Sequence, residues 1–205
     1  MEHSSTYLRR AALAYSLAGI GLLAFGFQFW FLGAVEAEAK GRLLAPFIFL
    51  SDDAFVSTEQ GGWIGLISKV GMFVGAFSLW KAGEPTGFGK KRTLLFIPMA
   101  GAIAYVLGQW MPLPFAPMGA FLSGIGMLVV GFASLKANIW TDWKRYIPLV
   151  VGGFPFIFMF PILIISGARP AQLIGLWGFP WLLLAWAAWQ RVQEISNEIP
   201  VTKSL

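Results

Sequence analysis

One charged side chain interrupts a long apolar run, and it is the residue with the clearest chemical potential in this sequence. Lys69 lies in the stretch GWIGLISKVGMFVGAFSLW, which is apolar enough to cross a bilayer. A charge at the centre of a membrane helix costs about 2.5–3.5 kcal/mol, so such a residue usually has a function or a partner. Lys69 follows Gly62 by seven residues, which places it about 10 Å below the outer end of the helix. An alternative is that its aliphatic stem extends to the headgroups.

Other polar side chains are expected at a similar depth. Gln28 and Gln109 lie near the outer ends of two other apolar segments, and no acid lies inside any of these segments. A counterion would come from the connection between the first two spans, which contains Asp52, Asp53 and Glu59. We predict an outward-facing polar pocket formed by the lysine and the two glutamines and closed by these acids. Its amine would donate to an anionic headgroup, a carboxylate ligand or a loop acid.

The sequence lacks the residues of most redox and hydrolytic centres. It has no cysteine and a single histidine, His3, which excludes disulfides and iron–sulfur clusters and argues against bis-histidine haem or a Ser-His triad. A retinal Schiff base on Lys69 is rejected, because six spans are expected and no carboxylate lies in a helix to act as counterion. Asp52 and Asp53 could bind a divalent cation, but no phosphatase or transferase motif surrounds them. We therefore expect no metal, no cofactor and no catalytic residue.

Composition assigns the chain to the integral membrane proteins. Of its 205 residues, 57% are hydrophobic and 12% are charged, and the mean hydropathy is +0.69, whereas soluble domains carry about 25% charged residues. The net charge of +5 is explained by basic cytoplasmic loops and not by nucleic acid binding. The hydrophobic segments use nearly all of the length, so residues 1–205 are expected to form one membrane domain.

Six segments are long and apolar enough to span a hydrocarbon core about 30 Å thick. The predicted spans are 11–33, 62–80, 93–110, 118–135, 146–166 and 172–189. The expected fold is an all-α bundle of six transmembrane helices in the cell membrane. The first segment is longer than the apolar core of a signal peptide, about 7–15 residues, and we interpret it as a retained helix, with cleavage near AVEAEA as the alternative.

The basic residues orient this bundle. With the N-terminus inside, eleven of the fifteen lysines and arginines fall in cytoplasmic parts and three in outer loops, as the positive-inside rule requires. Both termini are then cytoplasmic. The one long outer loop is 34–61, which holds half of the ten acids. Its centre, Leu43–Leu50, is apolar but too short to span, so it is predicted to lie in the interface or to cap the bundle.

Small residues one turn apart predict where helix backbones approach closely. They are Gly71 and Gly75 in the second span and Ala100, Ala104 and Gly108 in the third. We interpret them as packing within one chain, with a homodimer face as the alternative. At 100° per residue, the two glycines of the second span point away from its lysine, which then faces either lipid or a separate cavity.

Prolines interrupt the fifth span. Pro155 and Pro161 lie in its interior, close to Gly152 and Gly153. Each interior proline removes a backbone hydrogen bond and frees a carbonyl, which in a bilayer must find a partner or line a cavity. These four residues are a candidate transport hinge, and a kink that only adapts the shape of the helix is the alternative.

Tryptophans near the predicted span ends are typical of an interfacial belt. The eight that fall there are Trp30, Trp63, Trp80, Trp110, Trp140, Trp143, Trp177 and Trp189. The alternative is that aromatic side chains bind a pigment or a quinone.

Three classes of function remain. Few intramembrane charges and many packing motifs favour a non-enzymatic accessory, assembly or sensing component that binds lipids, other membrane subunits or a second copy of the chain. A small transporter that uses the kinked fifth helix is the first alternative. A division into two three-helix halves at Met111–Pro117 would suit it, although the halves show no convincing sequence match. A lipid-modifying enzyme is the second alternative.

Overall fold

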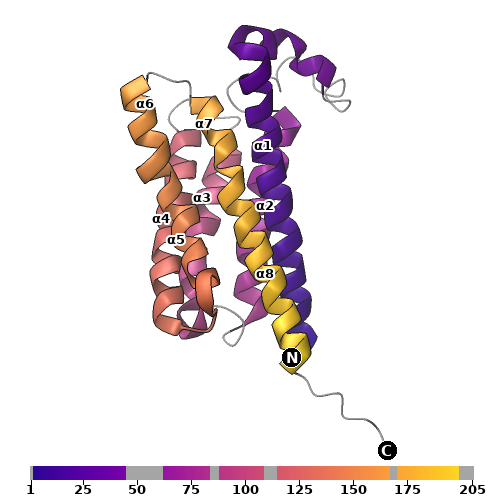
Figure 1. Cartoon of the computed structure of the whole chain (residues 1–205), viewed down its shortest axis with the longest axis vertical. Helices are drawn as coiled ribbons and strands as arrows, with labels where there is room; N and C mark the ends of the chain where they lie inside the picture. Colours follow the sequence, from indigo (N-terminus) through magenta and orange to yellow (C-terminus); the bar gives the residue numbers. More distant parts are fainter. Residues whose placement is uncertain (1, 45–61, 84–87, 109–114, 167–169, 199–205) are drawn as a thin grey trace, which may run out of the picture.

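The structure of the protein is a computed structural model that describes residues 2–44, 62–83, 88–108, 115–166 and 170–198. It describes side chains over 3–26, 65–83, 88–108, 117–162, 164–165 and 173–197. Every regular element within these ranges is helical, as predicted. Consecutive elements join end to end into six helical rods (Figure 1).

The rods follow one another up and down the bundle. The first is α1 (Glu2–Leu44) and the second is α2 (Gly62–Ala82). The third joins the 3₁₀ turn η4 (Gly89–Leu95) to α3 (Phe96–Leu107), and the fourth is α4 (Phe115–Ala137). The fifth joins the 3₁₀ turn η5 (Asp142–Tyr146), α5 (Ile147–Phe154), the π-helical turn η6 (Pro155–Met159) and α6 (Phe160–Ser166). The sixth joins α7 (Pro170–Leu176) to α8 (Gly178–Glu198).

Four rods are long and apolar enough to cross a membrane, judged by length and composition over the described part of the chain. They cover His3–Gly26, Pro117–Ala137, Asp142–Ile162 and Leu173–Asn197. These correspond to the first, fourth, fifth and sixth predicted spans. The second and third predicted spans coincide with α2, which packs against α1, and with η4 and α3, which pack against α4.

The first helix is much longer than its predicted span. The prediction of a loop from residue 34 is wrong for 34–44, because these residues continue α1. The segment AVEAEAKGRLL is rich in alanine, glutamate, lysine and leucine, which have the highest helix propensities, so its charges mark the end of the apolar run and not the end of the helix. The remainder of the predicted loop, 45–61, lies outside the described residues.

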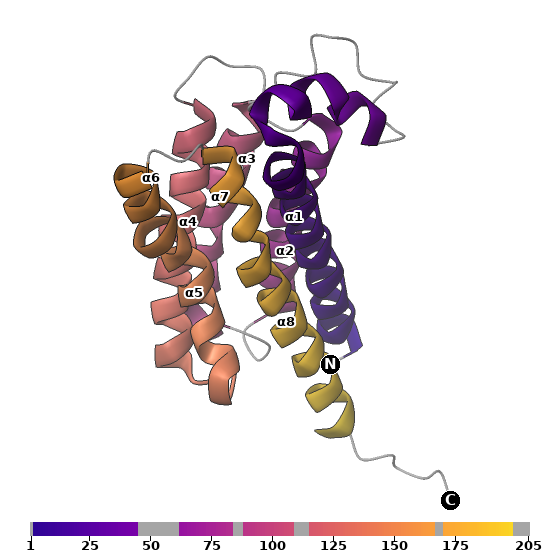
Figure 2. The ribbon, with the colours of Figure 1, turned by 45° about the horizontal axis from the view of Figure 1, so that its top comes forward.

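The length of α1 exceeds what a bilayer needs. Its 43 residues follow a path of roughly 64 Å at 1.5 Å per residue, about twice the thickness of the hydrocarbon core. The far end of the helix turns aside and lies across the top of the bundle (Figure 2). The helix therefore has an apolar part inside the bundle and a polar part at one end of it.

The six rods divide into two groups of three. In the first triad, α1 lies against α2 and against α7 and α8. In the second triad, α4 lies against η4 and α3 on one side and α5 on the other. In Figure 2, the second triad with α6 lies to the left, and α1, α2 and α8 lie to the right. The first, second and sixth rods thus form one unit, and the structure does not divide into the two sequence halves considered at Met111–Pro117.

Glycines bring the backbones together inside each triad. Gly71 of α2 faces α1, where an added β-carbon would lie 2.6 Å from the carbonyl oxygen of Ala14. Gly178 at the start of α8 faces α1 in the same way, at 2.5 Å from the carbonyl oxygen of Gly19. The glycines of the second triad that face a neighbouring helix are Gly101, Gly119 and Gly126 between α3 and α4, and Gly124, Gly131 and Gly152 between α4 and α5. Among the described residues, no such close glycine contact joins one triad to the other.

Side chains make the contacts between the triads, along a boundary that we call the seam. One edge of the seam lies between α2 and α3, and the other lies between η5–α5 and α7–α8. At the first edge the Trp80 and Phe96 rings lie 5.2 Å apart between centroids. At the second edge the Trp143 and Trp186 rings lie 6.2 Å apart. The triads are therefore joined more loosely to each other than their helices are joined within them.

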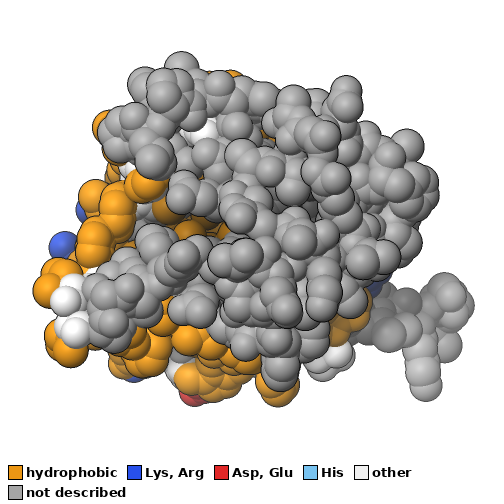
Figure 3. All heavy atoms as spheres, turned by 90° about the horizontal axis from the view of Figure 1, so that it is seen from above, with side chains coloured by type: hydrophobic (Ala, Val, Ile, Leu, Met, Phe, Trp, Pro, Cys, Tyr) orange, Lys and Arg blue, Asp and Glu red, His pale blue; other side chains and the backbone are white. Residues whose placement is uncertain are grey.

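The outer surface of the bundle is apolar. Ile157, Ile164 and Ile165, on η6 and α6, are 79%, 80% and 85% exposed. Viewed from the end of the bundle that holds α6 and α7, the described side chains at the rim are mostly hydrophobic (Figure 3). Such a surface is stable against lipid tails and unfavourable in water.

The tryptophans follow the predicted belt only in part. Trp143 and Trp189 are exposed, as an interfacial position requires. Trp140 and Trp177, by contrast, are buried inside the bundle and do not face its outer surface. The Trp140 ring packs against Phe88, at 5.4 Å between centroids, because the chain before η4 and the chain before η5 fold against each other. The side chains of Trp30, Trp63 and Trp110 lie outside the described residues.

Candidate functional site

The packing of α2 against α1 determines the direction of Lys69. Gly71 and Gly75 form the face of α2 that lies against α1, and the ring of Tyr15 covers Gly75. Lys69 lies about 200° around the helix from Gly71. Its side chain accordingly points away from α1 and into the seam, where it meets Tyr105 of α3. Because Gly71 and Gly75 face α1, the opposite side of α2, which carries Lys69, must face away from α1.

Lys69 is enclosed by the protein. The residue is 3% exposed, and its Nζ atom lies 4.5 Å from the centroid of the Tyr105 ring. Among the described residues, this nitrogen has no hydrogen-bond partner. The side chain does not lie along the lipid-facing surface of the bundle. The amine is instead held between two helices with one aromatic face as its electrostatic contact.

The ring contact offsets only part of the cost of burying the amine. A cation over a ring gains about 2 kcal/mol when it is desolvated, against about 2.5–3.5 kcal/mol for a lysine at the centre of a membrane helix. An ammonium group also carries three hydrogen-bond donors. A buried donor without an acceptor is costly, so an anion in contact with this nitrogen would be strongly favoured.

The other residues of the predicted pocket cannot be placed around the amine. The backbone of Gln28 lies in α1, but its side chain is outside the described residues. Gln109, Asp52, Asp53 and Glu59 are also outside them. The polar pocket and its acidic cover therefore stay predictions, and Lys69 is the member whose surroundings are described.

The predicted packing positions have different surroundings. Gly71 and Gly75 lie against α1. In α3, Ala100 is exposed, Ala104 is half-buried and Gly108 is buried. The close contact between α3 and α4 is made instead by Gly101, which lies against Ser123. A spacing of four residues does not identify which side of a helix faces its neighbour, because several small residues of α3 compete for that role.

In the proline-rich fifth rod, a side-chain hydrogen bond replaces the backbone hydrogen bond that Pro155 removes. Pro155 has no N–H to donate to the carbonyl of Val151, four residues earlier. That carbonyl accepts a hydrogen bond from the indole Nε1–H of Trp177, at 2.8 Å, across the seam. The chain continues as the π-helical turn η6, in which the N–H of Phe160 reaches back five residues to the carbonyl of Pro155. The freed carbonyl has thus found a partner, as the sequence requires of it.

The four predicted hinge residues do not share one environment. Gly152 lies against the backbone of Leu128 on α4, whereas Pro161 is exposed on α6. Gly153 and Pro155 are buried. A hinge role for these residues stays a prediction. The position of Trp177 in the sequence indicates an interfacial belt residue and not a hydrogen-bond donor. The sequence signals only that the Val151 carbonyl needs a donor, because Pro155 follows it by four residues.

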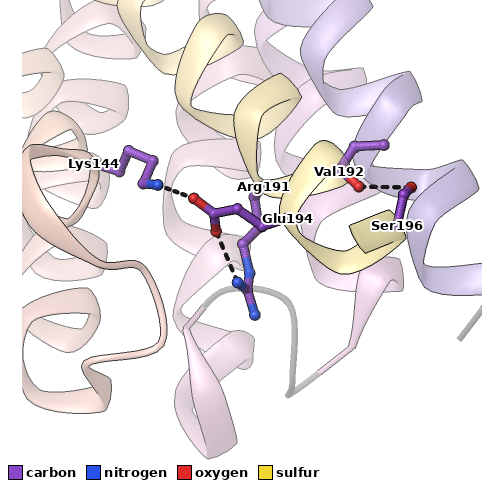
Figure 4. Close-up of polar contacts among 5 residues, drawn as sticks. All are labelled: Lys144, Arg191, Val192, Glu194 and Ser196. Carbon is purple, nitrogen blue, oxygen red and sulfur yellow. Dashed lines mark hydrogen bonds and ion pairs between the residues drawn. The ribbon is translucent and has the colours of Figure 1, made fainter. Parts of the chain in front are cut away.

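A charged cluster joins the two triads at the end of the bundle where α1 begins and α8 ends (Figure 4). The Lys144 ammonium, 6% exposed in its side chain, pairs with Glu194 Oε1. Arg191 Nη1 lies 2.8 Å from Glu194 Oε2 on the same helix. This cluster is not predictable from the sequence, because Glu194 lies in a segment that resembles an ordinary polar tail. The α8 helix extends through that segment and carries the acid to η5.

The described residues contain no group of three or more histidine, cysteine, aspartate or glutamate side chains that could hold a metal ion. No protein-family model, curated protein or solved structure matches the chain. A functional role for the buried amine of Lys69 stays a prediction.

Proposed function

We propose that this chain is a non-enzymatic, multi-pass membrane protein that binds an anionic group, a carboxylate or a phosphate, at Lys69. Such a protein acts as an accessory, assembly or sensing component that responds to a lipid or to a partner subunit. The observation that carries the proposal is the buried Nζ of Lys69, which contacts the Tyr105 ring and has no hydrogen-bond partner among the described residues. An oxyanion would supply the acceptor that this nitrogen lacks.

Ligand-dependent thermal stability tests this proposal. The purified protein in a nonionic detergent is mixed separately with phosphatidylglycerol, oleate, inorganic phosphate and phosphatidylcholine, and Tm is measured in each mixture. An anion that binds only the folded state stabilises it by about 2.7 kcal/mol at 100 times its Kd. Stabilisation by phosphatidylglycerol or oleate alone identifies a membrane anion, and stabilisation by inorganic phosphate identifies a soluble one. Phosphatidylcholine serves as the uncharged reference.

Two lysine variants locate the effect. Lys69→Met removes the buried amine, whereas Lys81→Met removes an exposed one at the end of the same helix. We expect the anion-dependent rise in Tm to disappear in the first variant and to persist in the second. An unchanged response of Lys69→Met to every anion would refute binding at this residue.

The proposal includes six spans with both termini in the cytoplasm. Support comes from the basic residues, which gather at the end of the bundle where α1 begins and α8 ends, and from the apolar outer surface. The chain has no cysteine, so single cysteines report the orientation without background. In intact cells, an impermeant maleimide should label Met118→Cys, at the start of α4, and should label Lys136→Cys, at its end, only after permeabilisation. The reverse pattern would refute the orientation.

A small transporter is the second candidate, favoured by the break in the fifth rod at η6. Broken helices in transporters commonly leave backbone groups that bind the substrate. Here the carbonyl that Pro155 frees is already bonded to Trp177, which favours the accessory role. Uptake of the bound anion into reconstituted vesicles would decide for the transporter, and binding without uptake would decide for the accessory component.

A further inference from the structure

The end of α4 gathers basic side chains from three elements. Lys136 lies on α4 itself and is exposed. The next residue, Ala137, lies against the start of η4, where a β-carbon added at Gly89 would be 3.4 Å from the β-carbon of Ala137. This contact brings the first turn of η4 to the end of α4, and that turn carries the exposed side chains of Lys90 and Lys91.

Asn138, the residue that follows α4, holds a cation from η5. Its backbone is left-handed, with a φ of 49°, and its side-chain oxygen accepts a hydrogen bond from Arg145 Nη1 at 3.3 Å. Arg145 Nη2 donates to the hydroxyl of Tyr146 at 2.8 Å, so two hydrogen bonds orient the guanidinium. We call the four cations around the end of α4 the basic cap, which consists of Lys90, Lys91, Lys136 and Arg145.

Buried rings fix the two connections that carry the basic cap. Phe88, before η4, and Trp140, before η5, are 3% and 0% exposed, and their ring centroids lie 5.4 Å apart. A buried aromatic pair of this kind contributes packing energy beyond the area that it buries, and it holds the two connections together. The cap therefore presents two pairs of cations side by side. One pair is on η4 and the other is at the end of α4.

No carboxylate among the described side chains neutralises the basic cap. The acids among these side chains are Asp142 and Glu194. Glu194 pairs with Lys144 and Arg191, which lie outside the cap. Asp142 is exposed on η5, so one carboxylate stands near four cations. Such an excess of positive charge attracts anions to this end of the bundle.

Exposed apolar side chains continue from the basic cap along the bundle. At 100° per residue, Ile125, Phe132 and Lys136 share one face of α4. Ile125 is 46% exposed and Phe132 is 59% exposed. Phe96, which directly follows η4, is 49% exposed. A phospholipid has the same order of chemical groups, with phosphate above acyl chains, whereas a soluble anion matches only the charge.

We propose that the basic cap binds a phospholipid whose headgroup carries two phosphates, one at each pair of cations, with its acyl chains along the exposed face of α4. Linking two phosphates in one molecule makes the second contact intramolecular. Such a lipid therefore binds more tightly than separate lipids with one phosphate each. The site is at the end of the bundle and not in the seam, so it does not depend on anion binding at Lys69.

Native mass spectrometry of the purified full chain in a nonionic detergent tests this inference. The measurement uses the Lys69→Met variant, so that anion binding at Lys69 does not contribute. Cardiolipin is the probe with two phosphates, and phosphatidylglycerol is the probe with one. We expect cardiolipin to bind at least about tenfold more tightly than phosphatidylglycerol.

Matched double variants locate the binding. Lys90→Gln with Lys91→Gln removes one pair of the cap, whereas Arg9→Gln with Arg10→Gln removes an exposed pair on α1 at the same end of the bundle. A lysine near the headgroups is worth about fivefold in affinity, so the first variant should weaken cardiolipin binding about 25-fold. The second should weaken it by at most about twofold, because salt screens distant charges. Lys90→Arg with Lys91→Arg should retain the affinity, because it retains both charges.

Three results would overturn the inference. One is equal affinity for cardiolipin and phosphatidylglycerol. Another is an equal loss of affinity in the two glutamine variants, which would mean that binding follows the total charge at this end of the bundle. The third is displacement of cardiolipin by equimolar pyrophosphate or poly-glutamate, which would identify a soluble anion or an acidic protein segment as the partner. Failure of anion binding at Lys69 would leave these measurements unchanged, so the two proposals fail independently.

Discussion

Replacing Lys69 with methionine should stabilise the protein when no anion is present. The methionine keeps most of the length and packing of the lysine stem and removes its charge. The cost avoided is at most about 2.5–3.5 kcal/mol, the value for a charge at the centre of a membrane helix, and the interaction lost is the contact with the Tyr105 ring, about 2 kcal/mol when desolvated. The difference predicts a gain of about 1 kcal/mol, which raises Tm by about 2–4 °C for a chain of this size.

The assay is thermal unfolding in a nonionic detergent free of anionic lipid. Lys69→Gln should give a smaller rise than Lys69→Met, because it removes the charge but keeps polar atoms that lack partners. Lys81→Met should instead lower stability by less than about 1 kcal/mol, since Lys81 is exposed and its contact with the Trp80 ring, at 4.7 Å from the centroid, is worth about 0.5–1 kcal/mol at an exposed site. Added phosphatidylglycerol or oleate should then favour the lysine over the methionine.

A double-mutant cycle separates the ring contact from the burial cost. Tyr105→Leu should destabilise the protein with Lys69 more than the protein with the Lys69→Met substitution, with a coupling of up to about 2 kcal/mol. A fall in Tm for Lys69→Met in anion-free detergent would refute the reasoning. It would mean that the amine already has a favourable partner in the folded protein.

Three further substitutions test the packing. Trp177→Phe should lower the free energy of unfolding by about 1–3 kcal/mol, because it leaves the buried carbonyl of Val151 without a donor. The loss should be smaller in a Pro155→Ala background, where a backbone N–H becomes available to the same carbonyl. Equal losses in both backgrounds would contradict this. Gly71→Ala should lower stability by about 1–3 kcal/mol through its clash with α1. Gly153→Ala should be neutral or stabilising, because its added β-carbon would lie 3.3 Å from the flexible end of the Ile157 side chain. Equal losses of stability in the two variants would show that the close approach of α1 and α2 does not limit the size of the residue at position 71. Glu194→Gln should cost about 1–3 kcal/mol, since it leaves a buried lysine without its carboxylate, and an unchanged Tm would show that the cluster adds no stability.

Helix positions were largely predictable because apolar run length is a local property. The predicted span 62–80 corresponds to α2 (Gly62–Ala82), and 118–135 corresponds to α4 (Phe115–Ala137). The end of α1 was not predictable in this way. Hydropathy shows where a helix leaves the apolar environment, but helix propensity decides where it ends, and the two differ by at least eleven residues at 34–44.

The partner of the broken helix illustrates a second limit. The sequence requires that the carbonyl freed by Pro155 find a donor, and that requirement is local. The identity of the donor is not local, because Trp177 comes from another rod and reaches Val151 only through the arrangement of the two triads. The same holds for Glu194, whose pairing with Lys144 joins residues far apart in the chain.

The sequence by itself determined that the chain is helical and apolar, where most of its helices lie, and that Lys69 is the unusual residue. These follow from composition and from the length and periodicity of apolar runs. Only the tertiary structure decided that the first, second and sixth rods form one triad, that glycine contacts stay within the triads, and that Lys69 points into the seam toward Tyr105. The reason is that small residues occur on several faces of these helices, and the choice among the faces depends on which helices meet.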